Sequence, residues 1–152
     1  MTVTIAPLPS VTNMRETIEA IIDQIGRDVT FYYPTSLSGC SLCSLDPITN
    51  TSTDSFCQQC GGDYWIPTYS GEVYLSKITW GKSEDKDWQT GGLIDTGDCL
   101  ITVMHSTQTE NVIFSSEYVR VDGRELDVKN IILKGVPTIN RILVALKEKE
   151  RV

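Results

Sequence analysis

Two Cys-x-x-Cys pairs, CSLC at residues 40–43 and CQQC at residues 57–60, stand thirteen residues apart and strongly constrain how this chain can fold. They lie within residues 35–63, a segment rich in Ser, Thr, Gly, Asp and Asn with few apolar side chains. A stretch of about thirty residues without an apolar core of its own is unusual inside a compact domain. The four cysteines are therefore the candidates for holding this segment in one conformation.

The spacing within each pair directs both sulfurs toward one point, as tetrahedral Zn²⁺ requires of four thiolates about 2.3 Å away. Gly39 before the first pair, and Gly61 and Gly62 after the second, supply the backbone freedom that such tight turns need. We therefore predict one structural zinc ion per chain, with four ligands: Cys40, Cys43, Cys57 and Cys60.

Paired cysteines have other common uses. Two disulfides would form if the protein met an oxidising compartment, and this alternative stays open. A redox-active pair precedes a helix whose N-terminus lowers the thiol pKa, but neither pair here is followed by a helical pattern. A catalytic zinc site keeps one position open for water, whereas four sulfur ligands close the site. We therefore expect the metal to have a structural role.

The sequence before the cysteines predicts one helix and one strand. Residues 11–26 place apolar side chains at three- and four-residue spacing and end in Gly26, as an amphipathic helix does. Residues 29–33 are rich in aromatic and β-branched side chains, and they predict a strand that ends at Pro34. The low-apolar segment with the cysteines would begin directly afterwards.

The sequence after the cysteines predicts strands. Residues 65–148 contain short apolar runs, one of them starting at Asn111, with turn signals about every ten residues. Asp122-Gly123 is the clearest hairpin turn, and residues 81–92 form a polar loop without strand character. We expect a single domain over residues 1–152, with a mainly β fold. It would be a small β-barrel with an N-terminal α-helix and an inserted zinc-ribbon-like loop.

Charge and hydropathy narrow the possible partners. The chain has 13 basic and 20 acidic residues, for a net charge of −7, and no basic run that would grip a phosphate backbone. No apolar run approaches the roughly 20 residues that cross a bilayer, so we expect no membrane partner. The first residues show no basic segment followed by an apolar one, so we expect a reducing compartment and no secretion signal.

No catalytic motif is present in the sequence. His105 is the only histidine, and Ser106 follows it directly, but adjacent residues of a strand point to opposite faces. We therefore expect an exposed histidine at a strand end and no nucleophile–base pair. Cys99 stands alone at a predicted strand start, as a small buried hydrophobic residue would. The expectation is that the protein is not an enzyme.

The C-terminal sequence EYVRVDGRELDVKNIILKGVPTINRILVALKEKE resembles the closing strands of tailed-phage head-closure proteins, also called stoppers or head–tail connectors. In that family an Asp-Gly hairpin and a final apolar strand complete a small β-barrel, and some members carry a two-CxxC insertion in the N-terminal third. The resemblance covers roughly residues 25–150 in pattern, and its most specific element is the cysteine spacing.

The resemblance implies a structural virion protein at the head–tail junction, assembled in the host cytoplasm. It would form a homo-oligomeric ring of about 6 or 12 copies that closes the DNA-filled head and provides the surface on which the tail docks. Its partners would be portal or adaptor proteins, tail proteins, and double-stranded DNA that passes through the lumen without sequence-specific binding. The polar loop would contribute oligomer or docking contacts through Lys82, Glu84, Asp85, Lys86, Asp87 and Trp88.

The alternative function is a nucleic-acid-binding module of the zinc-ribbon or OB type. Aromatic residues on both sides of the cysteine segment would then stack on unpaired bases. The missing basic stripe disfavours this alternative, because binding to nucleic acid relies on clustered Lys and Arg.

Overall fold

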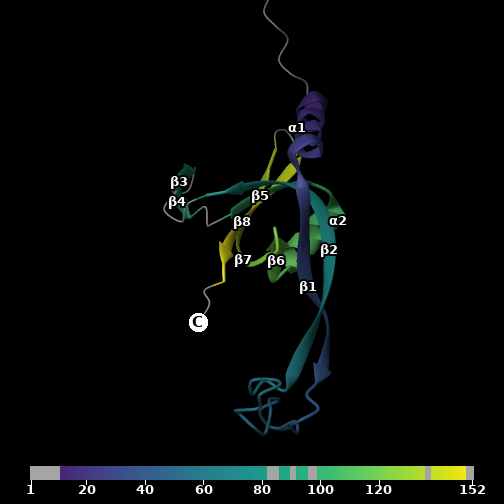
Figure 1. Cartoon of the computed structure of the whole chain (residues 1–152), viewed down its shortest axis with the longest axis vertical. Helices are drawn as coiled ribbons and strands as arrows, with labels where there is room; N and C mark the ends of the chain where they lie inside the picture. Colours follow the sequence, from purple (N-terminus) through teal and green to yellow (C-terminus); the bar gives the residue numbers. More distant parts are fainter. Residues whose placement is uncertain (1–10, 82–85, 90–91, 96–98, 136–137, 150–152) are drawn as a thin grey trace, which may run out of the picture.

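The computed structural model describes residues 11–81, 86–89, 92–95, 99–135 and 138–149. Two helices and eight strands make up this part of the chain (Figure 1). Their order is α1 (Val11–Ile25), β1 (Arg27–Gly39), β2 (Trp65–Trp80), β3 (Lys86–Gln89), β4 (Gly92–Asp95), β5 (Cys99–Met104), α2 (Thr107–Ser115), β6 (Tyr118–Val121), β7 (Arg124–Lys134) and β8 (Arg141–Glu148). The predicted mainly β class with an N-terminal helix is confirmed. Within the described ranges, neither helix has the length and apolar character needed to span a membrane.

Six strands form one antiparallel sheet that closes on itself in the order β1-β2-β5-β8-β7-β6. Closure occurs where β6 pairs with β1, from Thr30↔Arg120 to Tyr32↔Tyr118. The predicted Asp122-Gly123 turn joins β6 to β7, with positive φ at both residues as a tight hairpin requires. A closed sheet leaves few unpaired strand edges and encloses the inward-facing side chains of its strands.

The core lies inside the closed sheet and follows from the two-residue periodicity of its strands. In β5, the side chains of Cys99, Ile101 and Val103 are buried and alternate with half-buried ones. Every strand of the ring except β2 contributes fully buried side chains of this apolar kind, and Ile113 of α2 packs among them. Cys99 is fully buried in this cluster, which confirms that it acts as a small hydrophobic residue.

Strands β1 and β2 are much longer than the ring requires. They pair with each other from Arg27↔Ser76 to Gly39↔Trp65, whereas β6 reaches β1 only as far as Tyr32. Residues 33–39 and 65–70 therefore form a two-stranded extension, here called the arm. Figure 1 shows the arm at the far end of the molecule from α1, with residues 40–64, here called the tip loop, at its end.

The prediction that the first strand ends at Pro34 is wrong, because β1 continues to Gly39. A register shift lies between Pro34 and Ser36, and proline is tolerated at such bulges and on strands with a free edge. The segment without strand structure is accordingly the tip loop, 40–64, and not the whole of residues 35–63.

The predicted strand starting at Asn111 is also wrong in its first half, because residues 107–115 form α2. The helix begins after Ser106, whose side chain accepts a hydrogen bond from the backbone N–H of Thr109. A serine cap three residues before its partner is a recognisable start signal, but the apolar residues that follow resemble a strand. The real strand, β6, begins only at Tyr118.

The polar loop predicted over residues 81–92 lies partly outside the described residues, including Lys82, Glu84 and Asp85. Its remainder is not the loop that we expected, because β3 pairs with β4 from Lys86↔Asp95 to Gln89↔Gly92. A strand pair is joined by main-chain hydrogen bonds, so a polar sequence does not prevent this short hairpin. Lys86, Asp87 and Trp88 all belong to β3, and their role in docking stays a prediction.

The burial of Phe31 and the exposure of Phe114 predict different effects of substitution on the free energy of unfolding. Phe31 is fully buried and its ring meets the edge of Tyr74 at a centroid distance of 5.9 Å, whereas Phe114 on α2 is 55% exposed. We expect Phe31→Ala to lower the free energy of unfolding by about 3–5 kcal/mol. Phe114→Ala should change it by less than about 1 kcal/mol. Urea unfolding followed by circular dichroism measures both, and equal losses would contradict this account of the core.

Candidate metal centre

The tip loop begins as a direct continuation of the arm. Beyond the last strand pair, Gly39↔Trp65, the backbone N–H of Cys40 donates to the carbonyl of Tyr64 at 2.9 Å. A side chain on Gly39 would collide with the Tyr64 ring, since its Cβ would lie 2.8 Å from the phenol oxygen. Gly39 is thus needed for close packing, and not for the turn freedom that the sequence suggested. The first cysteine is therefore fixed by the β1–β2 ladder.

Each Cys-x-x-Cys pair folds into a tight turn that points its sulfurs inward. In the first pair, the N–H of Leu42 approaches the sulfur of Cys40 at 3.5 Å. In the second pair, the N–H of Gly61 donates to the carbonyl of Cys57 at 2.8 Å. Gly61 and Gly62 have φ of +62° and +101°, values that glycine adopts without strain. Two turns of this kind, brought face to face, gather four sulfurs.

The four cysteine sulfurs, from Cys40, Cys43, Cys57 and Cys60, lie within 4.8 Å of one another. Two close sulfur pairs join the two turns, with Cys40 Sγ 3.7 Å from Cys57 Sγ and Cys43 Sγ 3.5 Å from Cys60 Sγ. Four sulfurs about 2.3 Å from a tetrahedral metal ion are about 3.8 Å apart. Disulfide-bonded sulfurs would be about 2.05 Å apart, and all four cysteines are free thiols here. The cluster thus has the size of a tetrahedral metal site and can bind a metal ion.

The tip loop has no apolar core beside this cluster. Cys40 and Cys57 are buried, each 6% exposed, and Leu45 is half-buried, but three other large apolar side chains of the loop face outward. Leu42 is 73% exposed, Ile48 92% and Phe56 93%. Burial of apolar area normally holds a loop in one conformation. Because this loop buries little apolar area, its conformation depends on hydrogen bonds and on a bond or metal ion that links the sulfurs.

Backbone hydrogen bonds connect the two turns, and Leu45 and Ser52 form an isolated antiparallel β-bridge between them. The N–H of Thr53 donates to Ser44 at 2.9 Å, and the N–H of Ser52 donates to Gly62 at 3.0 Å. The loop between the two cysteine pairs thus folds back onto the second pair. This arrangement presents both pairs to the same point.

The surroundings of two of the thiols shift their pKa values in opposite directions. Burial opposes ionisation of Cys60, but backbone N–H groups of Gly62 and Tyr64 and the neighbouring thiols outweigh it and lower its pKa to about 6. Cys43 receives a favourable hydrogen bond from Ser52, yet burial and the other thiols raise its pKa to about 12. A metal ion bound here would displace the protons of these thiols, because the thiolate is the ligand.

Gln59 is a further residue of the site that sequence reasoning missed. Its side-chain oxygen accepts from the Cys40 thiol at 3.3 Å and from the Ser41 hydroxyl at 3.0 Å. A metal-bound thiolate has no proton to donate, so the amide would then turn its NH₂ group to Cys40. The signal in the sequence was the polar Gln-Gln between the two cysteines of the second pair.

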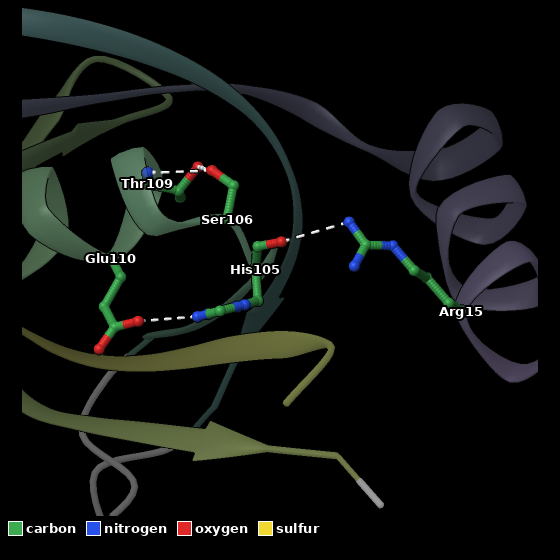
Figure 2. Close-up of polar contacts among 5 residues, drawn as sticks. All are labelled: Arg15, His105, Ser106, Thr109 and Glu110. Carbon is green, nitrogen blue, oxygen red and sulfur yellow. Dashed lines mark hydrogen bonds and ion pairs between the residues drawn. The ribbon is translucent and has the colours of Figure 1, made fainter. Parts of the chain in front are cut away.

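His105 and Ser106 do not form a catalytic pair. Figure 2 shows the His105 ring directed to Glu110 and the Ser106 hydroxyl directed to Thr109. His105 Nε2 lies 2.7 Å from a Glu110 carboxylate oxygen, and the Ser106 oxygen lies 2.7 Å from the Thr109 hydroxyl. Arg15 of α1 donates to the His105 carbonyl at 3.3 Å. The group therefore joins α1, β5 and α2.

The expectation of an exposed histidine is wrong, since the His105 side chain is 19% exposed. The reason is α2, which begins two residues after His105 and places Glu110 against the imidazole ring. Sequence reasoning treated this segment as a strand and so had no carboxylate to place beside the histidine.

Comparisons with known proteins give no match: no family model, no curated protein and no solved structure resembles this chain significantly.

The cysteine cluster yields a first prediction for the site. Cys40→Ser or Cys57→Ser should lower the bound metal from about one ion per chain and let a protease cut within residues 40–64. The closed sheet should survive, because its core contains none of these cysteines. Metal analysis, limited proteolysis with mass spectrometry, and circular dichroism measure the three effects. Cys99→Ala is the matched control and should retain the metal; loss of the whole fold in Cys40→Ser would mean that the metal does more than hold the tip loop.

The Ser106 contacts yield a second prediction. Ser106→Ala should lower the free energy of unfolding by about 1 kcal/mol, as loss of a helix cap does. Ser106→Asp should restore most of this loss, because an aspartate oxygen also accepts from the Thr109 N–H and carries favourable charge at a helix start. Thermal unfolding of the three proteins measures the difference. If Ser106→Asp were as unstable as Ser106→Ala, the role of Ser106 as a cap would be refuted.

Proposed function

We propose that this chain is a structural ring protein of the tailed-phage neck, of the head-closure or head–tail connector kind, with a zinc-bound tip loop on an extended arm. Its closed sheet would be the small β-barrel of that family, and its ring would close the DNA-filled head and provide a docking surface for the tail. The observation that carries the proposal is the position of the cysteine cluster, at the end of an arm that projects from the closed sheet.

The metal that best fits four thiolates at these separations is zinc, one ion per chain. A tetrahedral set of four sulfurs suits Zn²⁺ or an iron–sulfur centre, and pairs with two-residue spacing are typical of structural zinc sites. Such a closed site has no position for substrate water, so its contribution is to the folding of the tip loop. This supports a structural role and no catalytic one.

The charges support a protein that surrounds DNA without gripping it. The chain carries −7 overall, and no Lys, Arg or His occurs between Arg27 and Lys77, which includes the arm and the tip loop. Four thiolates on one Zn²⁺ would add about −2 at the tip. A negative surface repels a phosphate backbone, which lets double-stranded DNA pass through a lumen without sticking.

A nucleic-acid-binding module is the second candidate, and one observation favours it. A hollow of about 360 Å³ on β7 and β8 is lined by Lys129, Lys147 and Lys149 together with Asp127 and Glu148. Three lysines can bind phosphate, but the two carboxylates in the same hollow oppose it.

The aromatic residues do not strengthen this second candidate. The rings of Tyr32 and Tyr118 stack on each other at 4.7 Å, with Arg120 over the first and Lys149 over the second. Phe31 is buried in the core. These rings already have partners within the chain and are not free platforms for bases.

Native mass spectrometry of the zinc-loaded full chain tests the proposed function. We expect one zinc per chain and a closed ring, alone or after addition of a portal protein. In virion particles, we expect the chain to be located at the neck. Binding to double-stranded DNA, measured by fluorescence anisotropy at several salt concentrations, should be weak and without a steep salt slope. A monomer that binds DNA tightly, with a slope of several phosphate contacts, would favour the second candidate.

A further inference from the structure

The two turns of the cysteine cluster are positioned by hydrogen bonds that do not involve their sulfurs. The N–H of Cys40 donates to the carbonyl of Tyr64 at 2.9 Å. The N–H of Thr53 donates at 2.9 Å to the carbonyl of Ser44, the residue that follows the first Cys-x-x-Cys pair. These bonds belong to the backbone, so the backbone determines which sulfurs face each other.

The sulfurs that face each other belong to different turns. Cys43 Sγ lies 3.5 Å from Cys60 Sγ, and Cys40 Sγ lies 3.7 Å from Cys57 Sγ. A disulfide needs a separation of about 2.05 Å, so each of these pairs has to approach by roughly 1.5 Å. Small side-chain rotations cover such a distance. The same four sulfurs therefore suit two kinds of link, a shared metal ion and two cross-turn disulfides.

The two cross-turn pairs differ in their exposure to solvent. Cys40 and Cys57 are each 6% exposed, and the Cys40 thiol also donates to the side-chain oxygen of Gln59 at 3.3 Å. Cys43 and Cys60 are half-buried, so a dissolved reagent reaches their sulfurs more readily. The pair of Cys43 and Cys60 is therefore the first that an oxidant meets.

The charge around the cluster favours an oxidant without negative charge. No Lys, Arg or His occurs between Arg27 and Lys77, and the tip loop carries three acidic side chains, Asp46, Asp54 and Asp63. This surface repels an anionic oxidant such as glutathione disulfide, but it does not repel uncharged hydrogen peroxide. Hydrogen peroxide is also small enough to reach a half-buried sulfur.

We propose that hydrogen peroxide joins Cys43 to Cys60 in a disulfide, and that this bond replaces the metal ion as the link between the two turns. One thiolate of the pair attacks the peroxide, the O–O bond breaks, and the sulfur becomes a sulfenic acid as hydroxide leaves. The other thiolate attacks that sulfur, forms the S–S bond and releases a second hydroxide. The two sulfurs lose two electrons, which one peroxide accepts. This inference rests on the zinc site of the proposed function and names a modification of that site.

The first disulfide leaves only Cys40 and Cys57 as ligands, and two thiolates are too few for the closed site that a structural zinc ion requires. A second peroxide then joins these two cysteines in the same way. Both disulfides cross between the turns, so the tip loop stays closed after the metal has left. Disulfides within each Cys-x-x-Cys pair would leave the two turns unlinked. The zinc site and the disulfides are thus two chemical states of one cluster.

Peroxide treatment of the full, zinc-loaded chain tests the proposal. Samples taken at successive times are denatured, their remaining thiols are alkylated, and a coloured chelator reports the released zinc. Proteolytic cleavage before Asp46 and Asp54 separates the two turns, so a cross-turn disulfide joins two peptides in the mass spectrum and a disulfide within one turn does not.

The first oxidised species should contain alkylated Cys40 and Cys57 and a disulfide between Cys43 and Cys60. Zinc release should follow the formation of this first disulfide at the same rate. Cys99 is fully buried in the core and is the internal control, so it should remain a thiol throughout.

Two double variants, both treated without metal, form a matched pair. Cys40→Ser with Cys57→Ser keeps the half-buried cysteines and should form its disulfide at a rate within about threefold of the metal-free, unaltered chain. Cys43→Ser with Cys60→Ser keeps the buried cysteines and should oxidise about tenfold or more slowly. Both variants lack two metal ligands, so the difference between them reports the choice of pair and not the loss of metal.

Limited proteolysis measures whether the disulfide replaces the metal ion. Chymotrypsin cuts after Phe56, which is 93% exposed, once the loop opens enough to enter the protease. The oxidised, metal-free chain and the zinc-loaded chain should be cut at rates within about threefold of each other. The reduced, metal-free chain should be cut about tenfold or more faster.

The outcomes that contradict the inference differ from those that contradict the proposed function. A first disulfide within one Cys-x-x-Cys pair, or sulfinic acids without any disulfide, would overturn the inference and leave the zinc site standing. Equal oxidation rates in the two double variants would refute the preference for the half-buried pair. A reduced chain that contains no zinc would refute the metal of the proposed function, and with it the replacement inferred here.

Discussion

The hydrogen-bonded ladder between β1 and β2 is the interaction on which the rest of the structure depends. Its first half, up to Tyr32, belongs to the closed sheet, and its second half forms the arm. The same ladder therefore carries the rigidity of the core outward to Cys40, whose N–H continues it by one bond. Without this continuity, the first cysteine pair would have no fixed position from which to meet the second.

The β class and the composition of the site were readable from the sequence because both depend on local patterns. Alternation such as that of Cys99, Ile101 and Val103 marks an inward-facing strand, and the short spacing of the cysteines makes their sulfurs converge. The closure of the sheet through β6 and β1 was harder to foresee in detail, since that pairing joins residues far apart in the chain. Helix α2 was missed because its start depends on one side-chain contact, between Ser106 and Thr109, while its apolar residues suit a strand equally well. The length of the arm was missed because Pro34 usually ends a strand, and only the free edge beyond β6 permits it here.

The tip loop and the closed sheet are stabilised by different physical means. The sheet buries apolar side chains in the ordinary way, whereas the loop exposes Leu42, Ile48 and Phe56. A metal ion bound by the four cysteines would replace the missing core, since binding free energy would then become folding free energy. Leu42, Ile48 and Phe56, which are exposed, then need no folding role.

The opposed positions of Gly39 and Trp65 have a further consequence. Because these two residues are partners in the ladder, the two ends of the tip loop are adjacent in space, and the loop enters and leaves the arm at one point. An insertion of this kind can be lengthened, shortened or exchanged during evolution without a shift in strand register. The arm can therefore carry end loops of different length and sequence while the core of the closed sheet stays unchanged.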